Sequence, residues 1–356
     1  MITSLSIQNF RGLKQVTLND LRSVNLIVGG NNTGKTSVLE ALVLLFGDGT
    51  SVGNLPFTFR ANQSGGSSRD DHNDREHFWS WLFFDRDVGN PISIAARLDP
   101  DATVRLASKC VPESGVSSGP RLATVTRTDS RVADTTVPRP GRNPSGTVDL
   151  FEISDHQLRV NSPNSPAELR LAVLSTRPTN PALDAENFNQ VALLADGERR
   201  IENLMREIEP RLTRLRYARH PGTNGHLIFA DVGLSRAVPV SQMGQAFNRI
   251  LHIYTHILAH RSNVVLVDEI ENGIFCDAMP EVWRGLLAIC EQEGVQIFAT
   301  THSRECVMAA QSIAKERGKD ELCVQRLQLV KGQVEAARLG TKQLELAAEM
   351  GLEVRA

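Results

Sequence analysis

The sequence predicts an α/β fold in which helices flank a mainly parallel sheet, with an N-terminal antiparallel β subdomain and a β-rich insert. The C-terminal half alternates strand-like apolar runs with helical segments, a pattern typical of a parallel sheet covered on both faces. Near the N-terminus, short strand-like runs lead into a glycine-rich turn and an apolar helical stretch. The 356 residues allow two lobes, and we expect these at residues 1–180 and 181–356.

Composition excludes several classes of protein. The 39 basic and 41 acidic side chains give a net charge of −2, which argues against a protein that coats a polyanion. The longest apolar run, Ala41 to Phe46, is far shorter than the roughly 20 residues that span a bilayer. No secretory signal precedes it. The five cysteines are odd in number and form no CxxC pair. We therefore expect a cytoplasmic, reduced protein with no membrane segment.

The N-terminal elements follow from β-branched and apolar runs between turn residues. These runs predict strands at Ile2–Gln8, Gln15–Leu18 and Val24–Val28. Strong helix formers without an internal Gly or Pro predict a largely buried helix over Ser37–Phe46. Residues 47–75 are rich in Gly, Ser, Asn and Asp, and we expect a mobile loop there.

The insert, at about residues 50–172, is predicted to be rich in β structure beyond residue 90. Residues 104–148 carry seven basic side chains against three acidic ones, which fits either a contact surface for nucleic acid or an acidic partner, or an ordinary solvated face. The strands expected in the insert are Ile92–Leu98, Thr103–Ala107, Leu122–Thr126, Thr147–Ile153 and Gln157–Val160.

The remainder of the chain is predicted to alternate helix with strand. Apolar residues at helical spacing indicate helix from Ala185 to about Tyr217. We expect further helices at about Gln245–His260 and Met279–Gln292, and strands at Val264–Val267, Val295–Ala299, Val324–Val330 and Gln333–Leu339.

A phosphate-binding loop is indicated where the third strand ends. Its eight residues match G-x-x-x-x-G-K-[ST] and lie between a predicted strand and a predicted helix, the context that the motif requires. Lys35 is expected to reach the β- and γ-phosphates and the Thr36 hydroxyl to ligate Mg²⁺. Backbone N–H groups of the loop and the helix N-terminus would surround the phosphates. The residues expected to contact nucleotide are Gly29, Gly30, Asn31, Asn32, Thr33, Gly34, Lys35, Thr36 and Ser37.

Two carboxylates follow the predicted strand Val264–Val267. Ligands of open α/β sheets bind beyond the carboxyl ends of the strands. There Asp268 can hold Mg²⁺ through water, and Glu269 can polarise the water that attacks the γ-phosphate.

Histidines occur in two settings. His302 comes just after another predicted buried strand, so we expect it beside the carboxylates and in contact with the γ-phosphate. His252, His256 and His260 lie at i, i+4 and i+8 of one predicted helix, a spacing that resembles a metal-binding face. No HExxH pattern or carboxylate close by in the sequence supports a metal, and we expect these three residues on the helix surface or in packing.

These motifs carry a resemblance. Asn9-Phe10-Arg11-Gly12, the phosphate loop, Asp268 to Gly273 and Thr300 to Ser303 together resemble the ABC/SMC-type ATPases of the OLD, RecF and AAA-ATPase phage-defence group. The resemblance covers both ends of the chain, is weakest from residue 50 to 180, and implies a P-loop NTPase fold of the ABC/SMC-head type.

The resemblance also implies roles across a head-to-head dimer. Ser241 and Gly244, within Val240–Ala246, would touch the γ-phosphate bound to the other subunit, and Arg11 would lie near the phosphates of its own subunit. From the residues alone, Ser241 is expected only to be a helix N-cap.

The chain departs from this group in several places. Gln245-Ala246 replaces a second glycine and Phe275 stands where many relatives have histidine, so engagement across the dimer would be slower or differently triggered. No glutamine can be assigned to the loop that senses Mg²⁺ in transporter ATPases. We expect no Toprim nuclease domain here, because Ala356 follows soon after the last predicted strand pair, so any nuclease would be on another chain.

The predicted function is Mg²⁺-dependent ATP hydrolysis by a homodimer, or a higher homo-oligomer, that sandwiches two ATP molecules. ATP is the expected nucleotide because no N/TKxD element of GTPases occurs. The resemblance implies a sensor or scaffold of a prokaryotic anti-phage module that controls a separately encoded effector, for example a Toprim-like nuclease, with DNA or a phage component as trigger.

Two alternatives stay open. One is a RecF-like DNA-repair ATPase, favoured by the basic insert and by seven Arg against three Glu in residues 199–219. The other is an assembly scaffold that binds ATP without hydrolysing it. DNA-stimulated turnover would favour the first, and the absence of phosphate release would favour the second.

Overall fold

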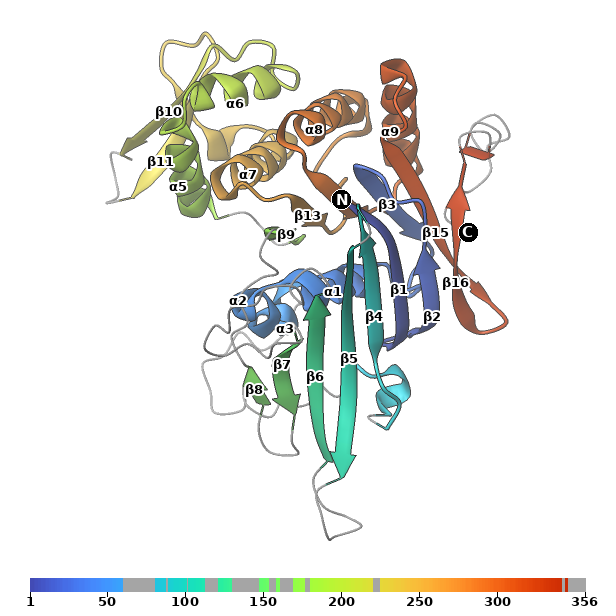
Figure 1. The fold of residues 1–356 in the computed structure, drawn as a ribbon. Helices are drawn as coiled ribbons and strands as arrows, with labels where there is room; N and C mark the ends of the chain where they lie inside the picture. Colours follow the sequence, from blue (N-terminus) through green and yellow to red (C-terminus); the bar gives the residue numbers. More distant parts are fainter. Residues whose placement is uncertain are drawn as a thin grey trace.

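Two large β-sheets and the helices between and around them make up the protein (Figure 1). A computed structural model of the chain describes residues 1–59, 81–87, 89–100, 102–112, 121–129, 147–153, 158–160, 169–176, 180–219, 225–340 and 343–344. No helix within these residues combines the length and the apolarity needed to cross a membrane.

The central sheet has six strands in the order β16-β15-β3-β14-β13-β9. All neighbours pair in parallel except β15 and β16, which are antiparallel. Strands β3, β13 and β14 are mostly apolar and are buried along their whole length, as is usual for strands of a parallel sheet covered on both faces. The strands are β3 (Val24–Gly29), β9 (Leu171–Leu174), β13 (Val264–Val267), β14 (Gln296–Thr300), β15 (Leu322–Val330) and β16 (Gln333–Leu339).

Helices cover one face of the central sheet (Figure 1). Alternate strand residues such as Val265 and Ile297 pack into this helical layer, and Trp283 is fully buried in it. The helices are α5 (Pro181–Ala192), α6 (Gly197–Arg206), α7 (Gln245–His260), α8 (Met279–Glu293) and α9 (Arg304–Arg317).

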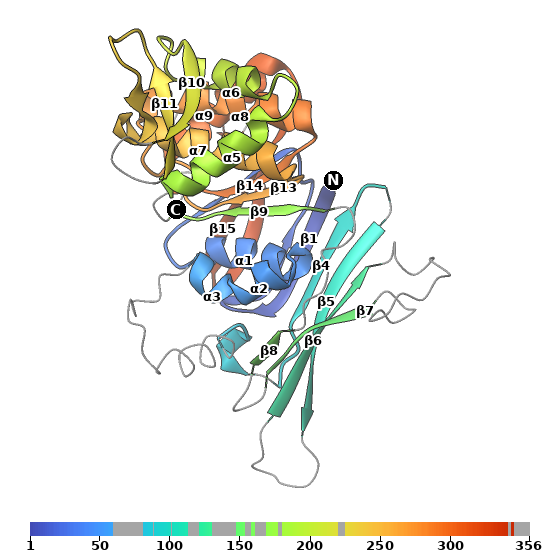
Figure 2. The same cartoon turned by 90° about the vertical axis from the view of Figure 1, so that its left-hand side faces the viewer.

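On the opposite face, α1 (Lys35–Phe46) lies between the central sheet and the second large sheet (Figure 2). Residues 38–46 of α1 are at most 1% exposed, and they share a core with Leu266 and Phe298 of the central sheet. The predicted buried helix is therefore confirmed, and it begins two residues earlier than expected, at Lys35.

The second sheet is antiparallel, with seven strands in the order β2-β1-β4-β5-β6-β7-β8. Strand β1 pairs with both β2 and β4, so the predicted N-terminal subdomain and the predicted β-rich insert form one continuous sheet. Its strands are β1 (Ile2–Phe10), β2 (Leu13–Leu18), β4 (Ser93–Leu98), β5 (Ala102–Pro112), β6 (Arg121–Asp129), β7 (Thr147–Ile153) and β8 (Leu158–Val160).

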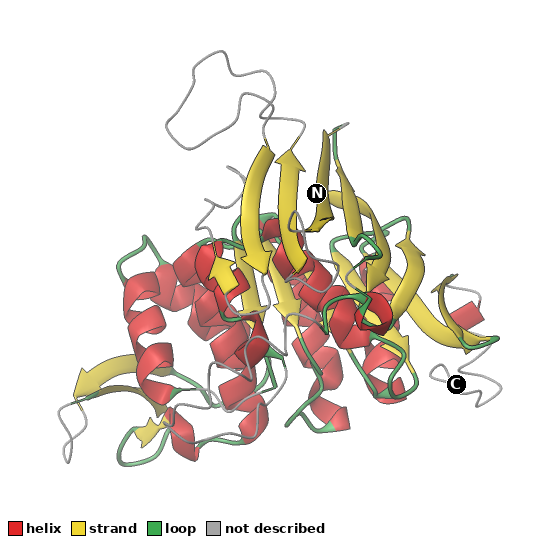
Figure 3. Ribbon diagram, turned by 90° about the horizontal axis from the view of Figure 1, so that it is seen from below, coloured by secondary structure: helices red, strands yellow, loops and turns green. Residues whose placement is uncertain are grey.

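A small third sheet corrects the prediction of helix up to Tyr217. Helix α6 ends at Arg206, whose guanidinium donates to the carbonyl oxygens of Leu212 (2.8 Å) and Thr213 (2.7 Å) and so holds the turn after the helix. Pro210 lies in this turn, where it interrupts further helix. The strands that follow are β10 (Arg214–Arg219), β11 (His226–Asp231) and β12 (Val238–Pro239), at the opposite side of the molecule from β16 (Figures 1 and 3).

Two other predictions change in the described part. Residues 47–75 were expected to be a mobile loop, but they include α2 (Gly49–Gly53) and α3 (Leu55–Thr58), because the Asp48 carboxylate caps α2 by accepting from the Ser51 N–H. Residues 60–75 of that loop lie outside the described residues. Of the seven basic side chains in residues 104–148, Arg105 alone belongs to the part whose side chains the structure describes, and it is exposed. Single turns of 3-10 helix, η1 (Phe84–Arg86), η2 (Val240–Gln242) and η3 (Cys276–Ala278), complete the described elements.

Candidate nucleotide site

The glycine-rich loop joins β3 to α1 through a backbone that only certain residues can adopt. Gly29 and Gly34 have φ values of 150° and 87°, and Asn32 has a φ of 62°. A Cβ atom on Gly29 would collide with the carbonyl oxygen of Leu327 on the neighbouring strand β15. The two glycines are therefore required by the fold of the loop itself.

Lys35 lies folded back over this loop. Its ammonium donates to the carbonyl oxygens of Gly29 (2.9 Å) and Gly30 (2.7 Å), and the residue is 6% exposed. Burial lowers the Lys35 pKa, while the negative charges of Asp268 and Glu269 act in the opposite direction. A phosphate group placed at the loop would compete with the two carbonyls for the protons of this ammonium.

Asp268 accepts hydrogen bonds from hydroxyl groups on two other elements. Its Oδ1 atom accepts from Thr300 at the end of β14 (2.6 Å) and from Thr36 at the start of α1 (3.4 Å). Burial raises the Asp268 pKa, and these two hydrogen bonds oppose the rise. The Thr36 hydroxyl and the Asp268 carboxylate are hard oxygen ligands of the kind that Mg²⁺ prefers, so the donor set fits this ion.

Glu269 follows in an uncommon backbone conformation. Its φ is 46°, in the left-handed region, and its N–H donates to the Thr300 hydroxyl over 2.8 Å. The side chain is half-buried, in contrast to that of Asp268, which is buried. The turn at Glu269 thus separates a buried carboxylate from one that solvent reaches.

His302 lies one loop away, between β14 and α9. Its backbone N–H donates to the Oε1 atom of Glu271 over 2.6 Å, and the residue is half-buried. Ser303 caps α9 by accepting from the Cys306 N–H over 3.0 Å. These contacts bring the predicted histidine to the loop that carries Asp268 and Glu269.

Arg11 lies in the turn between β1 and β2. Its Nε and Nη2 atoms donate to the two carboxylate oxygens of Glu40, each over 3.0 Å, and Nη1 donates to the Trp81 carbonyl oxygen over 3.3 Å. Both Arg11 and Glu40 are buried, and Glu40 lies on α1 just beyond the phosphate loop. The guanidinium therefore fastens the N-terminal sheet to α1, and its expected position near the phosphates stays a prediction.

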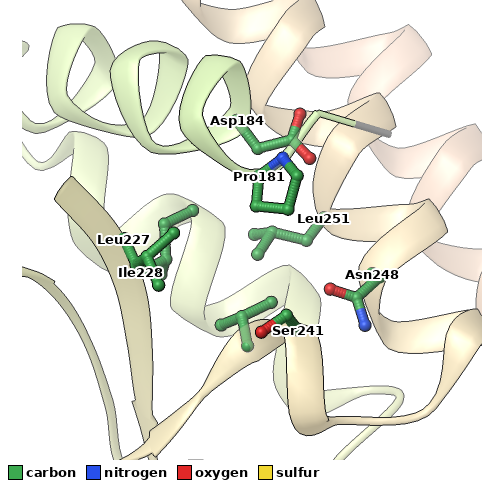
Figure 4. A pocket seen from close by; sticks show the side chains of 8 residues that line it. Pro181, Asp184, Leu227, Ile228, Ser241, Asn248 and Leu251 are labelled. Atoms are coloured by element: carbon green, nitrogen blue, oxygen red, sulfur yellow. The ribbon is translucent and has the colours of Figure 1, made fainter. Parts of the chain in front are cut away.

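Ser241 and Gly244 precede α7 and are both exposed. Gly244 is the N-cap of α7, so the expectation that Ser241 caps the helix is wrong: Ser241 lies in η2, three residues earlier. Asn248 holds this segment through bonds from its amide to the carbonyl oxygens of Met243 and Gly244. Ser241 borders a small pocket, which Asn248 and Asp184 also line (Figure 4).

A family model matches residues 24–307, a span that includes the glycine loop, both carboxylates and His302. The family is described as "AAA domain, putative AbiEii toxin, Type IV TA system". The chain belongs to this AAA family. It is therefore a P-loop ATPase.

Relatives of this AAA protein include an "ATP/GTP phosphatase" of Helicobacter pylori, 22% identical over 347 residues that make up 89% of each chain. A "DNA replication and repair protein RecF" of Nitrosococcus oceani is 52% identical over 44 residues, 12% of each chain. Solved structures with a similar chain course include an SMC head domain of Thermotoga maritima, with 10% identity and a TM-score of 0.45, which covers 95% of this chain and 99% of that one. An SMC head bound to the C-winged helix domain of ScpA gives 11% identity, a TM-score of 0.48 and coverage of 98% and 99%.

Two of the three histidines spaced four residues apart on α7 of the AAA protein contact α5. His252 Nδ1 lies 2.5 Å from Asp184 Oδ1, and His260 Nε2 lies 3.1 Å from Asn187 Oδ1. Among the described residues no group of three or more His, Cys, Asp or Glu side chains is arranged to hold a metal ion. The contacts of His252 with Asp184 and of His260 with Asn187 support the packing interpretation, and the sequence offered no sign that Asp184 lies beside His252.

Three residues of the site escaped prediction: Thr300, Glu271 and Arg249. Thr300 contacts Asp268 and Glu269, and Glu271 contacts the backbone of His302, as described above. Arg249, on α7, is 7% exposed and donates to the carbonyl oxygens of Ser175 (2.6 Å) and Asp268 (3.1 Å). Arg249 could have been identified from the sequence, because it is a single arginine among the apolar residues of α7.

Proposed function

We propose that this AAA protein is a Mg²⁺-dependent ATP hydrolase whose hydrolytic site comprises Lys35, Thr36, Asp268, Glu269 and His302. The observation that carries the proposal is the meeting of two hydroxyl groups, from Thr36 and Thr300, at one oxygen of Asp268. These groups come from three separate places, the start of α1 after β3, the loop after β13 and the last residue of β14, and they converge where nucleotide binds in open α/β sheets.

The site residues then have distinct tasks. Lys35 would exchange the carbonyl oxygens of Gly29 and Gly30 for phosphate oxygens. Thr36 and Asp268 would hold Mg²⁺, which when bound neutralises charge on the phosphates. Glu269 would orient a water molecule and accept its proton, and His302 would donate a hydrogen bond to the γ-phosphate.

The simplest test is phosphate release. Purified protein with Mg²⁺ and ATP should release inorganic phosphate, and chelation of Mg²⁺ should stop the release. A chain that binds ATP tightly without any turnover would instead support the non-hydrolysing scaffold. Because the name of the Helicobacter pylori relative includes GTP, the same assay with GTP would establish the base preference.

We also propose that ATP is sandwiched between two copies of the chain, with Ser241 and Gly244 of one copy at the phosphates of the other. Both residues are exposed, and Gly244 leaves the N-terminus of the 16-residue helix α7 accessible to an anion.

Complementation between two inactive variants tests this dimer. Lys35→Ala removes the loop lysine and leaves Ser241 intact, whereas Ser241→Arg does the reverse. A mixed dimer would contain one intact site, so mixing should restore up to roughly a quarter of the wild-type turnover. If each copy uses its own Ser241, the mixture will stay as inactive as its components.

The proposed biological role is that of a sensor or scaffold in an anti-phage module that controls a separately encoded effector, for example a Toprim-like nuclease. The family description, which names a toxin of a toxin–antitoxin system, supports a role in such a module. Affinity purification from the native host, with the product of the adjacent gene as the expected companion, tests it. The experiment should be run with wild-type protein and with Lys35→Ala, because control by ATP requires the companion to bind the two differently.

A RecF-like repair ATPase is the second candidate, favoured by the RecF likeness over 44 residues. Against it, the arginines around α6 and the small sheet are largely neutralised by acidic partners, which weakens a basic surface there. The ion pairs are Arg199–Asp196, Arg200–Glu293, Arg206–Glu202, Arg211–Glu209, Arg214–Glu198 and Arg216–Asp231. Salt-sensitive stimulation of ATP turnover by duplex or gapped DNA would decide in favour of repair.

A further inference from the structure

Four hydrogen bonds join the loop after β13 to the end of β14 and the loop that follows it. Thr300 makes three of them: its hydroxyl donates to Asp268 (2.6 Å) and accepts from the Glu269 N–H (2.8 Å), and its carbonyl oxygen accepts from the Ile270 N–H (3.0 Å). The fourth runs from the His302 N–H to the Glu271 carboxylate (2.6 Å). Each loop thus supplies both donors and acceptors to the other.

The Thr300 hydroxyl has no freedom to serve other partners. It is on a residue that is 1% exposed, and a hydroxyl has a single proton, which is directed at Asp268. Its lone pair then receives the Glu269 N–H, at a residue whose left-handed backbone is unfavourable for a side chain with a Cβ atom. One buried oxygen therefore orients the Asp268 carboxylate and holds the strained turn at Glu269.

Glu271 serves the histidine loop in the same way. Its Oε1 atom accepts from the His302 N–H, and its Oε2 atom is buried without a hydrogen-bond donor among the described residues. Burial lowers the pKa of Lys35 and of Arg249, and the negative charge of Glu271 opposes this shift at both cations. The single bond to His302 is the contact that determines where this carboxylate lies.

We infer that Thr300 and Glu271 are positioning residues that make the Asp268–Glu269 loop and the His302 loop a single unit. The inference rests on the proposed ATP hydrolysis and extends it. The hydrogen bond from Thr300 fixes the orientation of the Asp268 carboxylate that would bind Mg²⁺. The bond that Thr300 accepts from the Glu269 N–H holds the turn from which the Glu269 side chain extends. The carboxylate of Glu271 holds the backbone of His302 at a fixed position relative to that turn. Displacement of either loop would therefore shift the other.

Thr300→Val tests the first half, because valine keeps the shape of threonine and lacks the hydroxyl. Binding of a fluorescent ATP analogue at increasing Mg²⁺ should show a half-saturating Mg²⁺ concentration raised roughly 10-fold or more, and kcat should fall by a similar factor. Analogue binding without Mg²⁺ should stay at the wild-type level, since the Lys35 loop is untouched. Thr300→Ser restores the hydroxyl and should return both values close to wild type.

Thr301→Val is the matched control. Thr301 is equally buried at 1% exposure, but its hydroxyl accepts from the Ser303 N–H and touches neither carboxylate. It should leave the Mg²⁺ dependence close to wild type. Equal shifts in Thr300→Val and Thr301→Val, or a wild-type Mg²⁺ dependence in Thr300→Val, would overturn the inference.

Hydrogen exchange separates this inference from the proposed function. Thr300→Val should speed exchange of the Glu269 amide, whose acceptor is lost, and Thr301→Val should not. If wild-type protein releases no phosphate, the proposed hydrolysis fails, and unchanged exchange at Glu269 in Thr300→Val would then reject the positioning role as well.

For Glu271 the informative pair is Glu271→Ala and Glu271→Gln. The amide oxygen of glutamine can still accept from the His302 N–H, whereas alanine cannot. Glu271→Ala should lower kcat roughly 10-fold or more while KM and Mg²⁺-free analogue binding change little, and Glu271→Gln should keep most of kcat. Equal losses in both variants would show that charge, and not the bond to His302, is what matters.

Discussion

The guanidinium of Arg249 donates a hydrogen bond to the backbone carbonyl oxygen of Asp268, over 3.1 Å. The same guanidinium donates to the carbonyl oxygen of Ser175, just after β9, over 2.6 Å. Arg249 lies on α7, the helix that follows the exposed Ser241–Gly244 segment. Burial lowers the Arg249 pKa and the nearby carboxylates, Asp268 first, act against this. The buried guanidinium thus links α7 to the ends of β9 and β13. A shift of α7 would therefore displace the backbone of Asp268.

Replacement of Arg249 by methionine should weaken ATP-driven dimerisation more than ATP binding. Methionine fills most of the space but removes the hydrogen bonds to the carbonyl oxygens of Ser175 and Asp268, which destabilises the fold by roughly 1–3 kcal/mol. Sedimentation with Mg²⁺ and ATP should show a clear loss of dimer, while calorimetric ATP affinity changes less than about threefold. Arg249→Lys, which retains charge but has no planar fork, should fall between the two. Equal losses of ATP affinity and dimer would contradict a link through α7.

Lys35→Ala should abolish nucleotide binding. The variant loses the ammonium that lies within 2.9 Å of the loop carbonyls, and with it the charge expected at the phosphates. Titration calorimetry should detect no ATP binding at concentrations that saturate wild type. Lys14→Ala, at an exposed lysine on β2, is the control and should bind normally. Near-normal affinity in Lys35→Ala would remove the loop from the site.

Glu269→Gln should bind ATP and accumulate the proposed closed dimer, because the group proposed to accept the proton of water is lost while Thr36 and Asp268, the proposed Mg²⁺ ligands, remain. Phosphate release should fall by roughly 10²-fold or more. Size-exclusion chromatography with ATP should show a dimer that persists in this variant and dissociates in wild type as ATP is consumed. Hydrolysis by Glu269→Gln at the wild-type rate would mean that another group activates the water.

Acid should destabilise the fold through His256. Burial, with the charges of His260 and His252, lowers the His256 pKa from 6.5 to about 4. The unfolded chain then binds the extra proton between pH 6.5 and 4, so stability falls as pH falls through this window, by roughly 3 kcal/mol in all. Urea unfolding at pH 7 and pH 4.5 should show a smaller loss in His256→Phe than in wild type. Parallel losses would assign the acid sensitivity to other groups.

Gly285→Ala should destabilise the protein although it replaces glycine inside a helix. Alanine normally stabilises a helix interior by about 1 kcal/mol relative to glycine. At Gly285, on α8, a Cβ atom would collide with the hydroxyl of Tyr254 on α7, a residue that is fully buried. Overpacking of this kind lowers the free energy of unfolding by roughly 1–3 kcal/mol. Gly12→Ala, where a Cβ atom meets nothing within 4 Å, provides the comparison in thermal unfolding.

Local signals predicted most of the fold. The strands at Val264–Val267 and Thr147–Ile153 match the structure residue for residue, because apolar or alternating runs between turn residues are read within a few positions. The pairing of β1 with β4 escaped prediction, since Ile7 and Ile94 meet across a long stretch of intervening sequence. The strand Arg214–Arg219 was missed because its arginines suit a helix surface as well as a strand edge.

The candidate site likewise has residues that the sequence reveals and residues that it does not. The phosphate-loop spacing and the carboxylates after β13 are visible as short motifs, and His302 is visible as the first polar ring after a buried strand. The partners that orient them are not, because Thr300 is 32 residues from Asp268 and Arg249 is 74 residues from Ser175. A threonine next to another threonine carries no sign of which hydroxyl faces a carboxylate. That information exists only in the register of β13 against β14.

The place of β3 in the sheet has a consequence for protein synthesis. Strand β3 precedes both of its neighbours by a long stretch of chain, because β14 and β15 lie beyond residue 295. The nascent glycine loop therefore has no flanking strands until β14 and β15 have been synthesised. A chain truncated before β14 would be unable to complete the central sheet around this loop.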